Sequence, residues 1–104
     1  TLTEFTVNSN DTDTVQRQYQ LDIERAVRDD AGYKAGYVLR ERNAKNHWYV
    51  IQIYSNQEAL TKHLNSPGYR FMMSQIQGSL QNVTTKVLDG DILVNHGGQL
   101  FVRP

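Results

Sequence analysis

One continuous stretch, residues 49–71, restricts the fold more than any other part of the chain. It reads YVIQIYSNQEALTKHLNSPGYRF and joins an apolar run to residues typical of a helix start and a helix break. The apolar run, Trp48 to Tyr54, presents two faces that we expect to be largely buried, so it predicts an inner strand. Ser55 stands three residues before Glu58, a spacing in which hydroxyl and carboxylate satisfy free N–H groups at a helix start. A helix should therefore begin near Asn56.

The remaining elements follow from hydrophobic periodicity and turn residues. An amphipathic helix is expected over Thr14–Asp30, because Val15, Tyr19, Ile23, Ala26 and Val27 recur at helical spacing. Strands are predicted at Leu2–Val7 and Lys34–Arg42, and a five-residue loop at Asn43–His47 leads from the second of these to the Trp48 strand. The second helix is expected to be interrupted at Ser66 to Gly68 and restarted by Pro67 toward Leu80. A strand at Val83–Leu88 and extended segments at Ile92–Val94 and Leu100–Val102 follow.

The order β, α, β, β, α, β predicts a ferredoxin-like α+β domain covering residues 1–104. Its four-stranded antiparallel sheet would carry both helices on one face and leave the other face bare. A length of 104 residues allows a single domain, and a hydrophobic fraction of 38% suits a protomer that completes its core in a dimer.

Charge and cysteine content exclude several function classes. Eleven basic and eleven acidic residues give zero net charge, so there is no basic field to attract nucleic acid or an anionic membrane. The absence of cysteine excludes disulfides, thiolate catalysis and cysteine-ligated metals. No window approaches the roughly 20 apolar residues of a membrane span, which makes a cytoplasmic location the expectation.

The strand-to-helix stretch resembles the antibiotic biosynthesis monooxygenase family of small dimeric α+β barrel proteins. The matching residues are Ser55, Glu58, Ala59, Leu60, His63, Leu64, Ser66, Pro67 and Tyr69. The resemblance implies a homodimer in which two sheets pair face to face, with Gln99 to Arg103 as the arm that reaches the partner. Members of the family include oxygenases, heme-degrading proteins and proteins with no known reaction, so the resemblance implies the fold more specifically than the chemistry.

His63 matches a histidine that is frequent in the family. It has two interpretations: a base or hydrogen-bond donor facing a pocket between the helices and the sheet, or a structural residue that caps the kink before Ser66 and Pro67 through a backbone carbonyl. The resemblance favours the structural interpretation, because family members with different activities share this histidine. His47 and His96 lie in predicted turns without a neighbouring ligand, and no metal site is predicted.

Aromatic residues are the second candidate set. Tyrosine and tryptophan side chains suit a flat aromatic ligand such as a quinol or an anthrone, although packing in the core or at a dimer interface explains the same residues and is favoured for most of them. The set is Tyr33, Tyr37, Trp48, Tyr54, Tyr69 and Phe71. Trp48 and Tyr54 are the strongest ligand candidates, with Gln52 beside Tyr54 as a residue that could hold a substrate oxygen. The remaining predicted pocket residues are Tyr37, Tyr69 and Met73.

Two branches of the family can be compared with particular positions. The heme-degrading branch has a tryptophan where this chain has His63, an axial histidine at Met73, and an asparagine near Leu2 to Thr3; none of the three is present. The branch that oxidises aromatic polyketides has an asparagine and a tryptophan at Val50 and Tyr54, and only the aromatic character of the second remains.

The resulting hypothesis is a monooxygenase without metal or other cofactor that acts on a small aromatic substrate, with His63 and Tyr54 as catalytic residues. The alternatives are a dimer of the same fold that binds a small ligand or a protein without catalysis, and a heme-binding protein.

Overall fold

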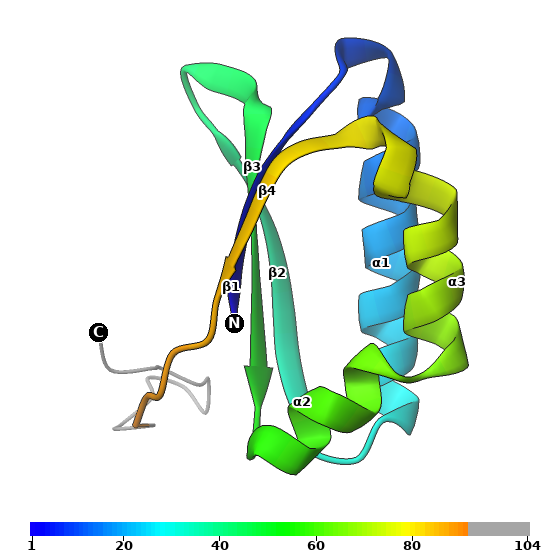
Figure 1. Ribbon diagram of the computed structural model, residues 1–104, viewed down its shortest axis with the longest axis vertical. Helices are drawn as coiled ribbons and strands as arrows, with labels where there is room; N and C mark the ends of the chain where they lie inside the picture. The colour runs from blue at the N-terminus through cyan, green and yellow to red at the C-terminus, as the bar shows by residue number, and fades with distance from the viewer. Residues whose placement is uncertain (92–104) are drawn as a thin grey trace.

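The computed structural model describes residues 1–91, which form one antiparallel sheet with helices on one side (Figure 1). The elements are β1 (Leu2–Val7), a 3-10 turn (Ser9–Asp11), α1 (Thr12–Asp29), β2 (Tyr33–Glu41), β3 (Ala44–Tyr54), α2 (Gln57–Leu64), α3 (Pro67–Ile76), a second 3-10 turn (Gln77–Ser79) and β4 (Leu80–Lys86). This is the predicted ferredoxin-like arrangement. The expected segments Ile92–Val94 and Leu100–Val102 and the arm Gln99 to Arg103 lie outside the described residues.

The sheet has the strand order β2-β3-β1-β4, with every neighbouring pair antiparallel. β1 and β3 are the two inner strands, and their register places Phe5 opposite Trp48 and Thr3 opposite Val50. The face that carries Phe5, Trp48 and Val50 is covered by α1 and α3, while α2 crosses the end of β3 (Figure 1). The sequence period of two along each strand therefore separates a covered face from an uncovered one.

The core lies between this covered face and the two long helices. Phe5 and Trp48 are fully buried with ring centroids 6.0 Å apart, and Tyr19 from α1 stacks on Phe5 at 5.9 Å. Met72 and Ile76 from α3 complete the same buried cluster. Burial of a side chain as large as Phe5 stabilises the fold by about 3 kcal/mol, so the aromatic centre is a principal source of stability.

The second face of the sheet is uncovered within residues 1–91. Leu2, Ile51 and Tyr37 form one row across three strands, and Leu39 lies beside Tyr49 in the next row. Tyr37 and Leu39 remain 46% and 47% exposed. The predicted bare face is confirmed. The strand that contains Trp48 is therefore buried on one face, and not on both faces as its apolar run predicted.

The second helix begins differently from the prediction. Asn56, and not Ser55, is the N-cap of α2, because the Asn56 side chain accepts a hydrogen bond from the Ala59 N–H at 2.9 Å. Asparagine is as good a cap as serine, and the helix therefore begins one residue later than a Ser55 cap would set. The predicted restart at Pro67 is confirmed: Pro67 occupies the first turn of α3, where its missing N–H is not needed.

Two further boundaries were predicted wrongly. The expected loop at Asn43–His47 is mostly strand, because β3 starts at Ala44 and pairs with Glu41 across a two-residue turn. β4 starts at Leu80, three residues before the prediction, because Leu80 pairs with Val7 of β1. Both errors arise where polar residues occupy strand positions at an exposed end, so hydrophobic periodicity gives no signal there.

The first helix starts earlier than expected and buries a different set of residues. α1 spans Thr12–Asp29, and Val27, which was expected on its apolar stripe, is 54% exposed. Asp22 is buried in its place. Among residues 1–91, no helix has the length and hydropathy required to cross a membrane.

Candidate functional site

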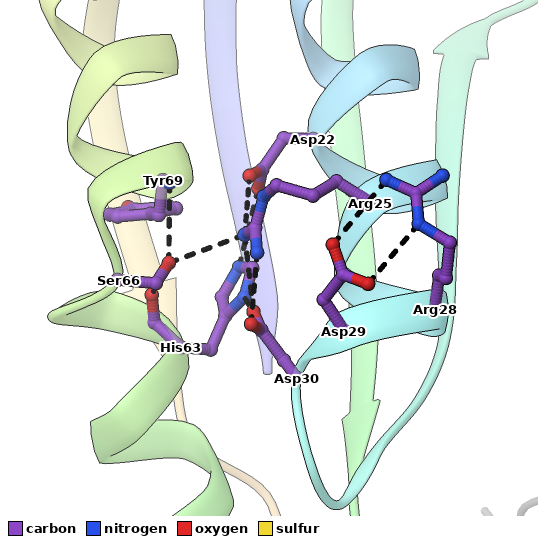
Figure 2. A network of polar contacts seen from close by, with 8 residues as sticks. All are labelled: Asp22, Arg25, Arg28, Asp29, Asp30, His63, Ser66 and Tyr69. Atoms are coloured by element: carbon purple, nitrogen blue, oxygen red, sulfur yellow. Dashed lines mark hydrogen bonds and ion pairs between the residues drawn. The ribbon is translucent and has the colours of Figure 1, made fainter.

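A cluster of polar and charged side chains, some buried and some partly buried, lies where the end of α1 meets the junction of α2 and α3 (Figure 2). We call Asp22, Arg25, Asp30, His63 and Ser66 the His63 cluster. His63 is 0% exposed, and the Asp22 side chain is 2% exposed. Ionisable groups at this depth are rare unless they pair, so the pairing within the cluster decides whether it stabilises the fold.

Arg25 bridges the two aspartates of the cluster. Its Nη2 donates to Asp22 Oδ1 at 2.9 Å, while Nη1 and Nη2 donate to the two Asp30 oxygens at 2.9 and 3.1 Å. The fork geometry of a guanidinium suits this paired contact with one carboxylate. Burial alone would raise the pKa of the Asp30 carboxyl, but hydrogen bonds from Arg25 and His63 outweigh it and hold that pKa below its usual range.

His63 lies between the same two aspartates. Its Nδ1 is 2.8 Å from Asp30 Oδ2, and its Nε2 is 3.4 Å from Asp22 Oδ2. An ionised carboxylate can only accept hydrogen bonds, so the Nδ1 proton is donated to Asp30. Both ring nitrogens thus face carboxylates, and these contacts replace the predicted contact of the His63 side chain with a kink carbonyl.

Ser66 ties the cluster to the helix junction. Its hydroxyl donates to the His63 carbonyl at 2.7 Å, accepts from Arg25 Nη2 at 3.2 Å and accepts from the Tyr69 N–H at 3.2 Å (Figure 2). The last contact makes Ser66 the N-cap of α3. The Ser66 and Pro67 pair therefore breaks the helix at the place where Arg25 approaches it.

Gly68 provides the space for this approach. A Cβ atom at Gly68 would lie 2.0 Å from Arg25 Nε, which is far inside contact distance. Because the guanidinium is held by Asp22, Asp30 and Ser66, it cannot move aside without loss of these hydrogen bonds. A residue without a side chain is required here by close packing.

Tyrosine rings enclose His63 on its other sides. The ring centroids of Tyr33, Tyr69 and Tyr54 lie 4.9, 5.1 and 5.7 Å from that of His63. The Tyr33 hydroxyl donates to Gln52 Oε1 at 2.8 Å. Burial raises the pKa of all three phenols, so they stay neutral hydrogen-bond donors at neutral pH.

Several buried polar atoms of this region lack a hydrogen-bond partner among the described residues. They are Asp22 Oδ2, His63 Nε2, Tyr54 Oη and Arg25 Nε. Buried polar atoms are nearly always paired in native structures, because each unpaired one costs about 1–3 kcal/mol. The first three come from α1, α2 and β3, and two of them, Asp22 Oδ2 and His63 Nε2, lie 3.4 Å from each other.

The structure brings together only part of the predicted site. His63, Tyr54, Tyr69 and Gln52 meet at the cluster described above. Trp48 lies in the aromatic core, where its Nε1 donates to the Lys45 carbonyl at 3.0 Å, and Met73 packs against the same core. Tyr37 lies on the uncovered face of the sheet, across the sheet from His63.

Asp22, Arg25 and Asp30 are the members of the site that sequence reasoning missed, whereas Tyr33 belonged to the candidate aromatic set. Asp22 had a detectable signal, because it falls on the same helical stripe as Val15, Tyr19 and Ala26. An aspartate on an apolar stripe is expected to have a buried partner. Asp30 had none, since an acidic residue at the end of a helix is usually solvated. Within residues 1–91, no group of three His, Cys, Asp or Glu side chains is arranged to hold a metal ion.

Comparison with known proteins agrees with this fold. The model of the family described as antibiotic biosynthesis monooxygenase matches residues 1–75, so the chain belongs to this family. A search of curated proteins finds no match.

Solved structures of similar fold come from several bacteria. A candidate antibiotic biosynthesis monooxygenase from Deinococcus radiodurans has a TM-score of 0.77 and 13% identity, covering 93% of this chain and 96% of its own. One from Bacteroides thetaiotaomicron has a TM-score of 0.75 and 18% identity, covering 89% and 92%. A candidate monooxygenase from Lactobacillus acidophilus has a TM-score of 0.76 and 19% identity; 80% of this chain matches only 40% of that longer one. At these identities the likeness shows the fold alone.

The close approach of Arg25 to Gly68 predicts that the effect of Gly68→Ala on stability changes sign when the Arg25 side chain is removed. Gly68→Ala should destabilise the protein by about 1–3 kcal/mol, because the new Cβ displaces the guanidinium. In an Arg25→Ala background the same change should stabilise by up to about 1 kcal/mol, since alanine is the better helix former. Urea unfolding of the four proteins measures both effects. Gly78→Ala, which meets nothing within 4 Å, is the matched control. Additive effects of the two changes within about 0.5 kcal/mol would contradict the contact.

The lowered pKa of Asp30 predicts a specific loss of stability in acid. The folded-state pKa lies below the unfolded value of 3.8, so the stabilisation is complete above that pH and is lost as the pH falls through the folded value. Asp30→Asn should lower the free energy of unfolding at neutral pH by about 1–3 kcal/mol and flatten its fall in acid. Urea unfolding between about pH 7 and about pH 3 measures this. Asp29→Asn, at an exposed pair with Arg28, should follow wild type. Parallel acid profiles for Asp30→Asn and wild type would exclude the ionised pair.

Proposed function

We propose that this protein is a cofactor-independent monooxygenase that acts on a small aromatic substrate of the quinol or anthrone class. Family membership supports a monooxygenase-like activity. The observation that carries the proposal is a wall of three tyrosine rings around His63, together with two buried atoms, His63 Nε2 and Tyr54 Oη, that have no hydrogen-bond partner among the described residues. A flat ring with hydroxyl or keto oxygens would pack against the tyrosine rings and would form hydrogen bonds with the unpaired atoms.

Tyr54 and Tyr69 are the members of the wall that border solvent. Both are half-buried, whereas His63 is completely enclosed. Rotation of either tyrosine ring would open a route to the unpaired atoms without a change in the backbone. In this proposal the substrate ring enters between Tyr54 and Tyr69, and Gln52 at the end of the cluster orients a substrate oxygen.

The chemistry requires a base, a dry site and dioxygen. The base removes a proton from the substrate, whose anion passes one electron to dioxygen, and the resulting radical and superoxide join in a carbon–oxygen bond. Loss of the second C–H proton then breaks the O–O bond. For an anthrone, the methylene carbon becomes a ketone and the second oxygen atom leaves as water, so no external reductant is consumed. His63 Nε2, the ring nitrogen without a hydrogen-bond partner, is the proposed site of proton transfer.

We also propose that two copies pair through the uncovered sheet face. The apolar row of Leu2, Ile51 and Tyr37, with exposed Leu39 beside it, supports this pairing. A sheet with one apolar face in water is stabilised when a second layer covers that face. The catalytic cluster lies on the opposite side of each sheet, so each protomer would contain its own site.

A second candidate function, ligand binding without catalysis, is favoured by the enclosure of His63. Both of its nitrogens face carboxylates and its side chain has no exposed surface. The described hollows in the surface lie instead near Thr6, Asn8 and Asn46, at the other end of the sheet. In this alternative the His63 cluster only joins α1 to the α2–α3 junction.

Oxygen consumption separates the two functions. With a panel of anthrones, quinols and flavonoid-like phenols, wild type should consume dioxygen with at least one compound. His63→Gln should lower the rate by about 100-fold or more, as expected for loss of a general base. Tyr54→Phe should lower it by about tenfold, the effect of one hydrogen bond.

The matched control is Tyr49→Phe, which removes a phenol outside the cluster. The Tyr49 hydroxyl bonds to Glu41 at 2.7 Å on the other face of the sheet, so its loss should leave turnover unchanged. Circular dichroism of each variant establishes that the fold is retained. Absence of turnover across the panel, or full activity of His63→Gln, would favour the ligand-binding function.

A further inference from the structure

The contact between Asp22 and His63 brings together two atoms that can each carry a lone pair and no proton. Asp22 Oδ2 and His63 Nε2 are 3.4 Å apart, both are buried, and neither has a hydrogen-bond partner among the described residues. Nδ1 already donates its proton to Asp30. If Asp22 were ionised and Nε2 unprotonated, two lone pairs would face each other in a buried site. Such an arrangement is strongly unfavourable at low dielectric.

A single proton between the two atoms removes this opposition. It can reside on Nε2, which gives an imidazolium between two carboxylates, or on Oδ2, which gives a neutral pair. In both cases the cluster becomes neutral, because Asp22 and Asp30 contribute two negative charges, Arg25 one positive charge, and the proton the other. The remaining groups that face His63 are the neutral phenols of Tyr33, Tyr54 and Tyr69, and these cannot supply the missing charge.

We propose that Asp22 is a further functional residue of this site, which shares one proton with His63 and forms with it the pair that exchanges a proton with the substrate. At rest the pair holds one proton across Oδ2 and Nε2. It has room for a second, taken from the substrate, after which the cationic cluster lies beside the substrate anion. The second proton returns when water leaves. Asp22 acts through His63 and is therefore a positioning residue.

Its role in turnover rests on the proposed function, whereas the shared proton is a property of the protein alone. The test is nuclear magnetic resonance of the wild-type protein at about pH 7, with no substrate present. The 15N shift of His63 Nε2 and the 13C shift of the Asp22 carboxyl carbon are recorded. His63→Gln and Asp22→Asn identify these signals by their disappearance, and Asp29→Asn is a matched control that should leave both unchanged.

The proposal predicts that one of the two atoms is protonated: either Nε2 falls in the protonated range, or the Asp22 carbon does. It also predicts that in Asp22→Asn, which has no carboxyl to share the proton, the Nε2 signal lies in the range of an unprotonated nitrogen that accepts a hydrogen bond. An unprotonated Nε2 together with an ionised Asp22 in the wild type would overturn it. Because no substrate is involved, this result is independent of whether any compound is turned over.

Discussion

Arg25 holds together the part of the molecule on which the proposed chemistry depends. Asp22 and His63 are buried and Asp30 is partly buried where α1 meets the junction of α2 and α3, and the guanidinium contacts both carboxylates. Without a cation at this position the carboxylates would repel each other, and the burial of His63 would be strongly unfavourable. Two local features accompany this contact: Ser66 accepts from Arg25 and caps α3, and Gly68 has no side chain where Arg25 passes.

The same cluster shows what the sequence could and could not predict. The element order, the bare sheet face and the helix restart at Pro67 follow from local patterns, and the structure confirms them. The Asn56 cap and the early start of β3 do not, because several residue types satisfy a cap and because exposed strand ends carry polar side chains. The pairing of Asp22 and Asp30 with His63 joins residues far apart in the chain, so no local pattern reveals it.

Only part of the predicted pocket comes together in the structure. His63, Tyr54, Tyr69 and Gln52 come together because the end of β3 and the helix junction meet at one end of the sheet. Trp48 is six residues from Tyr54, so it shares its face but lies far along the strand, in the core. Tyr37 pairs with Ile51 of the uncovered face, and a register shift between Tyr33 and Ala35 places it on the opposite face from Tyr33. Aromatic composition alone cannot make these distinctions, since they depend on strand register. Family membership establishes the fold, whereas the choice of substrate depends on the few groups that the rings of Tyr33, Tyr54 and Tyr69 surround.

The central claim is that the unpaired atoms of the His63 cluster form a site for an aromatic oxygen compound. A crystal structure of the protein soaked with an anthraquinone, the product class of the proposed reaction, tests it most directly. The account predicts the ring between Tyr54 and Tyr69, with a ligand oxygen within hydrogen-bond distance of Tyr54 Oη or His63 Nε2. An anthraquinone that binds only elsewhere, or does not bind, while the three tyrosines still enclose His63, would contradict it.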